Sequence, residues 1–394
     1  MPAIFIILAV GIIVGSWMFS GTVPALIYYG LKFLNPSLLL VSAFIISTIT
    51  SVATGTAWGS ASTAGIALIS IASQLGVPSG MAAGAIIAGA VFGDKMSPLS
   101  DTTNLAALVT KVNIFAHIKS MMWTTIPASM IGLIVWFFAG LHFKGQANSK
   151  QIQKLLKELM TIYNINFVVW LPLIVIIICL IFRISTVPSM LISSLSAIII
   201  GTFNNHFNIV DGFKATFDGF NHTMVHQPHL SKNVTTLIEQ GGMMSMTQII
   251  ATIFCGYAFA GIVEKAGCLD VILETVSKGV KSVGTLILIT VVCCLMLVFA
   301  AGVASIVIIM VGVLMKEMFE KMNISKSVLS RTLEDSSTMV LPLIPWGTSG
   351  IYYSQQLNVF VNQYLIWTIP CYLCALITIV YGFTGIGIKK LSKD

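Results

Sequence analysis

One segment of this 394-residue sequence gathers oxygen-bearing side chains at a break in apolar sequence. It contains Asp94 and Asp101, with Pro98 between them. Because proline has no backbone N–H, it opens a helix and frees nearby carbonyl oxygens for other partners. Carboxylate, hydroxyl, amide and carbonyl oxygens are the ligands that a hard cation such as Na⁺ prefers. The segment therefore predicts a cation site, with the candidate ligands Asp94, Ser97, Ser100, Asp101, Thr102, Thr103 and Asn104.

A carboxylate in such a site can also couple two ion movements. It binds either a proton or Na⁺, so competition between the two for Asp94 or Asp101 links their fluxes. Lys95 follows Asp94 directly and could neutralise it, which leaves Asp101 as the stronger candidate for direct Na⁺ binding. The alternative is a plain loop in which Asp or Ser caps the next helix.

A second oxygen-rich segment lies late in the chain. Two carboxylates are followed by three hydroxyls, and Pro342 and Pro345 come soon after. Ionisable groups at a helix break within apolar sequence indicate a functional site. The alternative is a solvated loop with a helix cap, since Lys326 and Arg331 lie close by. The candidate ligands here are Glu334, Asp335, Ser336, Ser337 and Thr338.

The composition places these segments in a membrane. Hydrophobic residues make up 56% of the chain and charged residues 9%, with a net charge of +7 from lysines spread over the loops. The mean hydropathy is +0.94. Long stretches such as 33–93 contain no Asp, Glu, Lys, Arg or His, and one crossing takes about 20 residues. We therefore expect an all-α integral membrane protein with roughly ten to twelve membrane segments in one polytopic domain, 1–394, and no nucleic-acid partner.

The first and last parts of the chain have the same sequence features in the same order. Gly21 lies 73 residues before Asp94, and Gly261 lies 74 residues before Asp335. A Pro-Leu pair follows each acidic segment. Interrupted apolar segments at corresponding positions of two halves are the signature of transporters whose site lies between repeats. The repeat predicts a transporter with a first unit at 1–141, a linker region with two spans at 142–240, and a second unit at 241–394.

Several further features refine this organisation. The breaks at 20–24 and 54–60 predict interrupted helices. The small residues of 80–93 predict a helix packed against protein and not lipid. The Lys-rich stretch 144–158 contains Leu155 and is followed directly by Leu159, which favours an amphipathic helix at the interface.

The remaining chemical groups carry weaker signals. His222, His226 and His229 surround Pro228, which favours a surface loop over a metal site or a pH sensor. The cysteines have no metal-binding spacing, so we expect packing roles and no cofactor apart from the transported ions. The sequence has no phosphate loop, no H-E-x-x-H and no G-x-S-x-G, which argues against ATP-driven transport and against an enzyme.

The sequence resembles the NhaC-type sodium/proton antiporter family. The likeness is carried by the stretches 15–24, 55–59 and above all 93–104, and in the second half by 241–246 and 334–337. The resemblance implies a multi-pass antiporter of the bacterial cytoplasmic membrane that extrudes Na⁺ with the inward proton gradient. It also implies two inverted repeats with broken helices and helical hairpins. The implied partners are Na⁺, H⁺ and membrane lipid, and a homodimer stays open as the form of assembly.

Two points limit what the resemblance implies. Members of this family carry additional hydrophobic sequence before the segment that begins at Gly15, so we expect an N-terminal hairpin to be missing from this chain. The family also includes exchangers of organic acids, in which proton and malate uptake is coupled to Na⁺ and lactate exit. A Na⁺-coupled organic acid exchanger is therefore the alternative function. A passive channel is the rival from another class, and the internal repeat argues against it.

Overall fold

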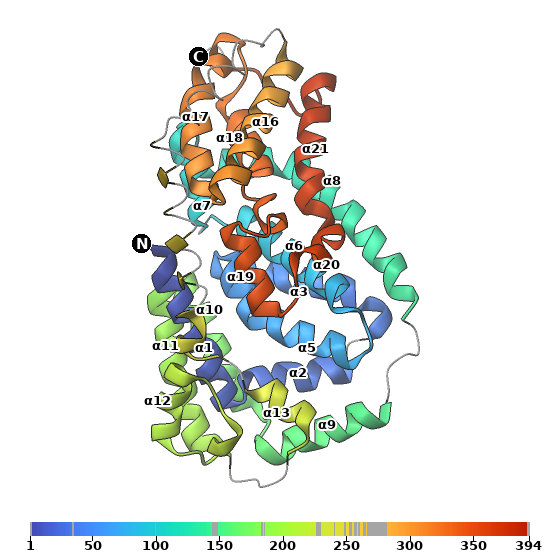
Figure 1. Ribbon diagram of the computed structural model, residues 1–394, viewed down its shortest axis with the longest axis vertical. Helices are drawn as coiled ribbons and strands as arrows, with labels where there is room; N and C mark the ends of the chain where they lie inside the picture. Colours follow the sequence, from blue (N-terminus) through green and yellow to red (C-terminus); the bar gives the residue numbers. More distant parts are fainter. Residues whose placement is uncertain are drawn as a thin grey trace.

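The computed structural model describes residues 2–33, 35–98, 100–143, 149–182, 184, 186–225, 230–239, 241–247 and 282–391, with isolated positions between 250 and 265. Within these ranges every element is helical, apart from one isolated bridge between Ile324 and Lys390. The elements form an elongated bundle (Figure 1). The prediction of an all-α fold is confirmed.

The first helices are interrupted where the sequence predicted breaks. Helix α1 (Pro2–Ser20) and α2 (Thr22–Phe33) meet at Gly21, whose φ is +85°, and the chain bends there by 69°. Helix α3 (Leu39–Thr54) ends at Gly55, whose φ is +66°. Glycine adopts this left-handed conformation without the steric cost that a Cβ brings. After Gly55 come α4 (Ala57–Ser60), a π-helical turn (Ala61–Gly65) and α5 (Ile66–Gln74).

Helix α6 (Ser79–Met96) lies in the centre of the molecule (Figure 1). A side chain at Gly89 would collide with the backbone of Phe44, and one at Gly93 with the carbonyl oxygen of Thr48, both on α3. The small residues thus let two helices approach closely, as the sequence predicted. After a break at 97–100, the chain continues through α7 (Asp101–Thr110) and α8 (Ile114–Leu141).

The middle of the chain forms a group of helices around α1. Helix α9 (Ser149–Ile162) buries Leu155 and Leu159 and exposes Lys154 and Lys157, which confirms an amphipathic helix. Helix α10 (Leu171–Ile181) packs on α11 (Thr186–Asn204). Helices α11 and α12 (Ile209–Asp218) pack on α1, at the lower left of Figure 1. Helix α13 (Lys232–Ile238) contacts α9.

The last part of the chain has its own interrupted helices. Helices α16 (Val283–Ala301) and α17 (Ala304–Lys321) are separated at Gly302, whose φ is +67°. Helix α18 (Lys326–Ser336) is followed by an irregular stretch at 337–347, and then by α19 (Thr348–Leu357), α20 (Val361–Tyr364) and α21 (Ile369–Thr384). Every residue of 327–336 is buried. The alternative of a solvated loop at Glu334 and Asp335 is therefore wrong, because this segment is a helix enclosed by its neighbours.

Helix lengths in the described residues support a multi-pass membrane protein. Three helices are long and apolar enough to cross a membrane alone: α8, Val187–Asn204 within α11, and α16. Three further spans result if each bent helix pair is one crossing. Because many helices end at a break, helix length alone does not give the number of membrane crossings. The number of ten to twelve membrane segments stays a prediction.

Candidate cation-binding site

Four helix breaks meet at one cavity of about 150 Å³. They are the breaks at 55–56, 97–100, 302–303 and 337–347. At a break, the last carbonyls of one helix and the first N–H groups of the next lack helical partners. The cavity is therefore bordered by backbone groups of helix ends as well as by side chains, and some of these groups bond across a break, as the N–H of Thr348 does to the carbonyl of Gly302 at 2.9 Å. Its lining residues are Gly55, Thr56, Ala57, Trp58, Val91, Asp94, Asp101, Thr102, Val303, Ala304, Ser305, Thr338, Leu341, Thr348, Ser349 and Tyr353.

Asp94 reaches this cavity from the last turn of α6. It is 7% exposed. The hydroxyl of Ser100 and the backbone N–H of Ala57 donate hydrogen bonds to its carboxylate. Its Oδ1 atom has no hydrogen-bond partner among the described residues. A buried carboxylate oxygen without a partner is costly unless a proton or a cation occupies it.

Glu334 supplies a second unpartnered carboxylate, from α18. It is 0% exposed, and neither Oε1 nor Oε2 has a hydrogen-bond partner in the part of the chain that the structure describes. The hydroxyl of Thr338 lies near this carboxylate and also lines the cavity. Glu334 and Asp94 are close enough to interact electrostatically. Two acidic groups from distant parts of the sequence thus lie within electrostatic range of one another with unpartnered oxygens, Asp94 at the cavity wall and Glu334 outside the cavity lining.

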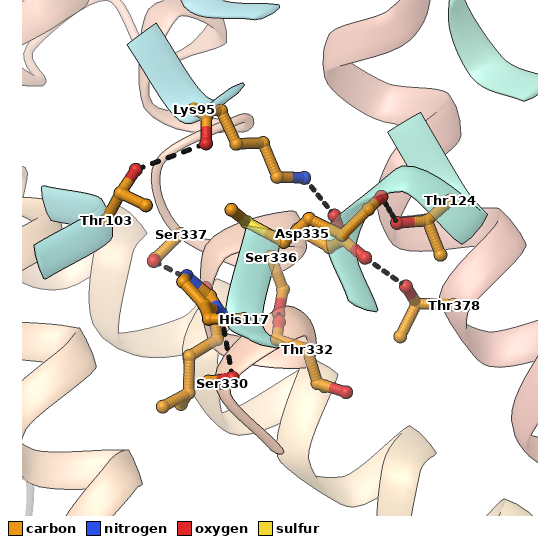
Figure 2. A network of polar contacts seen from close by, with 12 residues as sticks. Lys95, Thr103, His117, Thr124, Ser330, Thr332, Asp335, Ser336, Ser337 and Thr378 are labelled. Carbon is orange, nitrogen blue, oxygen red and sulfur yellow. Dashed lines mark hydrogen bonds and ion pairs between the residues drawn. The ribbon is translucent and has the colours of Figure 1, made fainter. Parts of the chain in front are cut away.

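Lys95 forms an ion pair with Asp335 instead of neutralising Asp94 (Figure 2). Both side chains are 0% exposed, and Nζ of Lys95 contacts Oδ1 of Asp335. The hydroxyl of Thr378 on α21 donates to Oδ2 of the same carboxylate. The expectation that Lys95 is the partner of Asp94 is therefore wrong, because Lys95 extends toward α18.

Asp101 lies at the start of α7 and is exposed. Its Oδ1 accepts a hydrogen bond from the backbone N–H of Thr102 at 2.9 Å, and both residues line the cavity. Ser100 caps the helix by accepting from the N–H of Thr103 at 3.4 Å. The alternative of a helix cap is correct for Ser100, within a segment that also borders the cavity.

The other predicted ligands of the first segment hold the break in shape. The hydroxyl of Ser97 donates to the carbonyl of Val52 at 2.9 Å, and that of Thr103 to the carbonyl of Lys95 at 3.3 Å. The amide of Asn104 donates to the carbonyl oxygens of Pro98 and Ser100, at 2.8 and 2.6 Å. These side chains act on the backbone and not on the cavity.

The three hydroxyls after Asp335 have two different roles: two bond to their own helix and one lines the cavity. Ser336 donates to the carbonyl of Thr332, and Ser337 donates to that of Leu333 at 2.6 Å. Hydroxyls bonded to their own helix are held in place and satisfied. Thr338 has no partner for Oγ1 among the described residues. Of the three, only Thr338 lines the cavity.

Some residues of the site have no signal in the sequence. Thr378 lies within an apolar helix, and Tyr353 looks like an ordinary membrane-helix aromatic residue, whereas Trp58 belongs to the break predicted at 54–60. Trp58 stacks on Tyr352 with ring centres 4.7 Å apart, and its Nε1 donates to the hydroxyl of Ser349 at 3.3 Å. These contacts join α4 to α19 at the cavity wall.

The histidine segment lies elsewhere. His222 is exposed and its Nδ1 is hydrogen-bonded to the carboxylate of Glu239, while His226 and His229 lie outside the described residues. Among the residues that the structure describes, no three His, Cys, Asp or Glu side chains form a metal-binding group.

The sequence model of the Na⁺/H⁺ antiporter family matches residues 89–386. A Haemophilus influenzae protein named as an uncharacterized Na⁺/H⁺ antiporter is 36% identical over 395 residues, which cover 100% of this chain and 84% of the relative. The Na⁺/H⁺ antiporter NhaC of Alkalihalophilus pseudofirmus is 34% identical over 98% of this chain and 83% of its own length. The malate-2H⁺/Na⁺-lactate antiporter of Bacillus subtilis is 33% identical over 98% of this chain and 81% of its own length.

Proposed function

Because the chain belongs to the Na⁺/H⁺ antiporter family, we propose that it exchanges Na⁺ for H⁺ across the cytoplasmic membrane of a bacterial cell. The resemblance that the sequence suggested is confirmed by this membership. A family of antiporters carries out transport, and the helical architecture agrees with a multi-pass membrane protein.

One observation carries the proposed site: Asp94 and Glu334 are both buried, both have unpartnered oxygens, and they are close enough to interact electrostatically. Na⁺ at this place would receive carboxylate oxygens from both halves of the chain, with the hydroxyl of Thr338 beside them. Hard cations are bound by such oxygen sets. Protons and Na⁺ compete for the same two carboxylates, so binding of one releases the other.

The helix breaks supply the movement that transport requires. Breaks at Gly55 and Gly302 have the same form, a helix end in left-handed glycine followed within two residues by a new helix. Both border the cavity. We take them as corresponding parts of two inverted repeats, which would open the cavity alternately to the two sides of the membrane.

The charge of the cavity favours Na⁺/H⁺ exchange over exchange of organic acids. Asp94 and Asp101 line it, and no Lys, Arg or His is among its described lining residues. A carboxylate substrate would meet like charges without a counter-ion. The malate and lactate named for the B. subtilis relative therefore have no evident partner in this cavity.

Everted membrane vesicles test the function directly. Vesicles from an antiporter-deficient bacterium that expresses the chain would be energised until their interior is acidic. A pH-sensitive dye would report the internal pH. We expect added Na⁺ to release protons from these vesicles. Added K⁺, malate or lactate should release no more protons than they release from control vesicles that lack the chain. Proton release by malate or lactate and not by Na⁺ would contradict the proposal.

A further inference from the structure

The two halves of the chain each place an acidic residue at a helix break, but only one is open to a mobile ion. Asp94 has a free Oδ1 at the cavity wall. Asp335 has both oxygens engaged, Oδ1 by Lys95 and Oδ2 by Thr378. Neither Asp335 nor Glu334 is among the residues that line the cavity. Asp94 and Asp335 thus lie at nearly the same distance in sequence from Gly21 and Gly261, respectively. They differ because both carboxylate oxygens of Asp335 have side-chain partners, whereas Oδ1 of Asp94 has none among the described residues.

At Asp335 the neighbouring positive charge comes from the side chain of Lys95. Its ammonium and Na⁺ are both monovalent cations that a carboxylate binds. Figure 2 shows the lysine extending from its backbone to Asp335, with Thr378 on the other side of the carboxylate. A buried carboxyl group of this kind requires either a cation or a proton, because an uncompensated buried charge is strongly destabilising.

The other charged groups nearby do not replace Lys95. Arg331 lies one turn earlier on α18 and attracts Asp335 electrostatically, but it forms no ion pair with Asp335, and its Nη1 donates to the carbonyl of Gly387 at 3.1 Å. His117 is hydrogen-bonded to Ser330 at 2.7 Å. Glu334, next to Asp335, carries the same sign of charge. Of the described residues, Lys95 is the cationic side chain in direct contact with Asp335.

We propose that Asp335 and Thr378 form a second, latent cation site, which Lys95 occupies as a tethered cation. The chain then binds one mobile Na⁺, at Asp94 and Glu334, because the second position is taken. Removal of the lysine side chain frees both the carboxylate and the space for a second Na⁺. The inference rests on the proposed function, since it counts the ions that the same antiporter binds.

Equilibrium binding of radioactive Na⁺ to the purified chain in detergent tests the proposal. Lys95→Ala should double the Na⁺ bound per chain relative to the unaltered protein. The double variant Lys95→Ala with Asp335→Asn should return binding to the unaltered value, because the amide brings no charge. Lys321→Ala is the matched control, since this lysine is 78% exposed and should leave binding unchanged.

The outcomes separate the two proposals. If the unaltered chain binds no Na⁺, the proposed function is overturned. If the unaltered chain binds Na⁺ and Lys95→Ala binds the same amount, Asp335 has taken a proton instead, and the latent site is wrong while the function stands. Folding of Lys95→Ala is followed by thermal unfolding in Na⁺ and in choline. Stability restored by Na⁺ and not by choline supports the latent site, and failure to fold in both overturns it.

Discussion

Lys95 of α6 and Asp335 of α18, which lie 240 residues apart in the sequence, form an ion pair in which both side chains are fully buried. The pair joins the two acidic segments that the sequence singled out. It also determines which carboxylates stay free, because it engages Asp335 and leaves Asp94 and Glu334 without a cation.

We first expect Asp335→Ala to destabilise the protein strongly. Removing one partner of a buried pair leaves the other charge uncompensated, at a cost of about 3–5 kcal/mol. The measurement is thermal unfolding in detergent. Glu317→Ala is the control, because its pair with Lys321 is 4.0 Å long and exposed, and such pairs contribute about 0–1 kcal/mol. Equal losses for the two variants would contradict the role assigned to the buried pair.

Asp101→Asn should weaken Na⁺ binding without abolishing exchange. Asp101 lines the cavity but is exposed, so water screens its attraction for the ion. A loss of about 1 kcal/mol corresponds to an increase of roughly fivefold in the Na⁺ concentration for half-maximal proton release. Complete loss of exchange would restore Asp101 to the principal role that the sequence assigned to it.

Two neighbouring hydroxyls should behave differently when removed. Thr338 lines the cavity with a free hydroxyl, whereas Ser337 donates to the carbonyl of Leu333. Thr338→Val should raise the half-maximal Na⁺ concentration by roughly three- to tenfold, the effect of about 1 kcal/mol. Ser337→Ala should leave that concentration unchanged. Identical Na⁺ dependence in both variants would remove Thr338 from the site.

Because α3 and α6 are in close contact, we expect a larger side chain between them to destabilise the protein. A Cβ at Gly89 would collide with the backbone of Phe44, while a Cβ at Gly261 would meet none of the described residues within 4 Å. Gly89→Ala should therefore cost about 1–3 kcal/mol through overpacking, and Gly261→Ala much less. Thermal unfolding of both variants measures the difference. A Gly89→Ala protein as stable as the unaltered one would mean that the helices separate easily.

Local features of the sequence predicted local features of the fold. Gly21, Gly55 and Pro98 mark helix breaks because glycine and proline act on their own backbone. The amphipathic pattern of 144–158 likewise predicted a helix with one buried side, which the structure has at Ser149–Ile162.

Properties that depend on distant contacts could not be read in this way. The partner of Lys95 is 240 residues away, so its neighbour Asp94 was the natural choice. The hydroxyl of Thr378 has no motif around it, and its role follows from the packing of α21 on α18. The charges on α18 suggested a solvated loop, because the sequence does not show that surrounding helices enclose them.

The most direct test compares Asp94→Asn and Glu334→Gln with Glu317→Gln in everted vesicles. Each amide keeps the shape of its carboxyl group but exchanges neither a proton nor Na⁺. Asp94 and Glu334 are buried with free oxygens, whereas Glu317 is 79% exposed. We predict that Na⁺-dependent proton release is lost in each of the first two variants and normal in the third, with all three present in the membrane in equal amounts. Normal release in Asp94→Asn or in Glu334→Gln would contradict a shared site built from both halves of the chain.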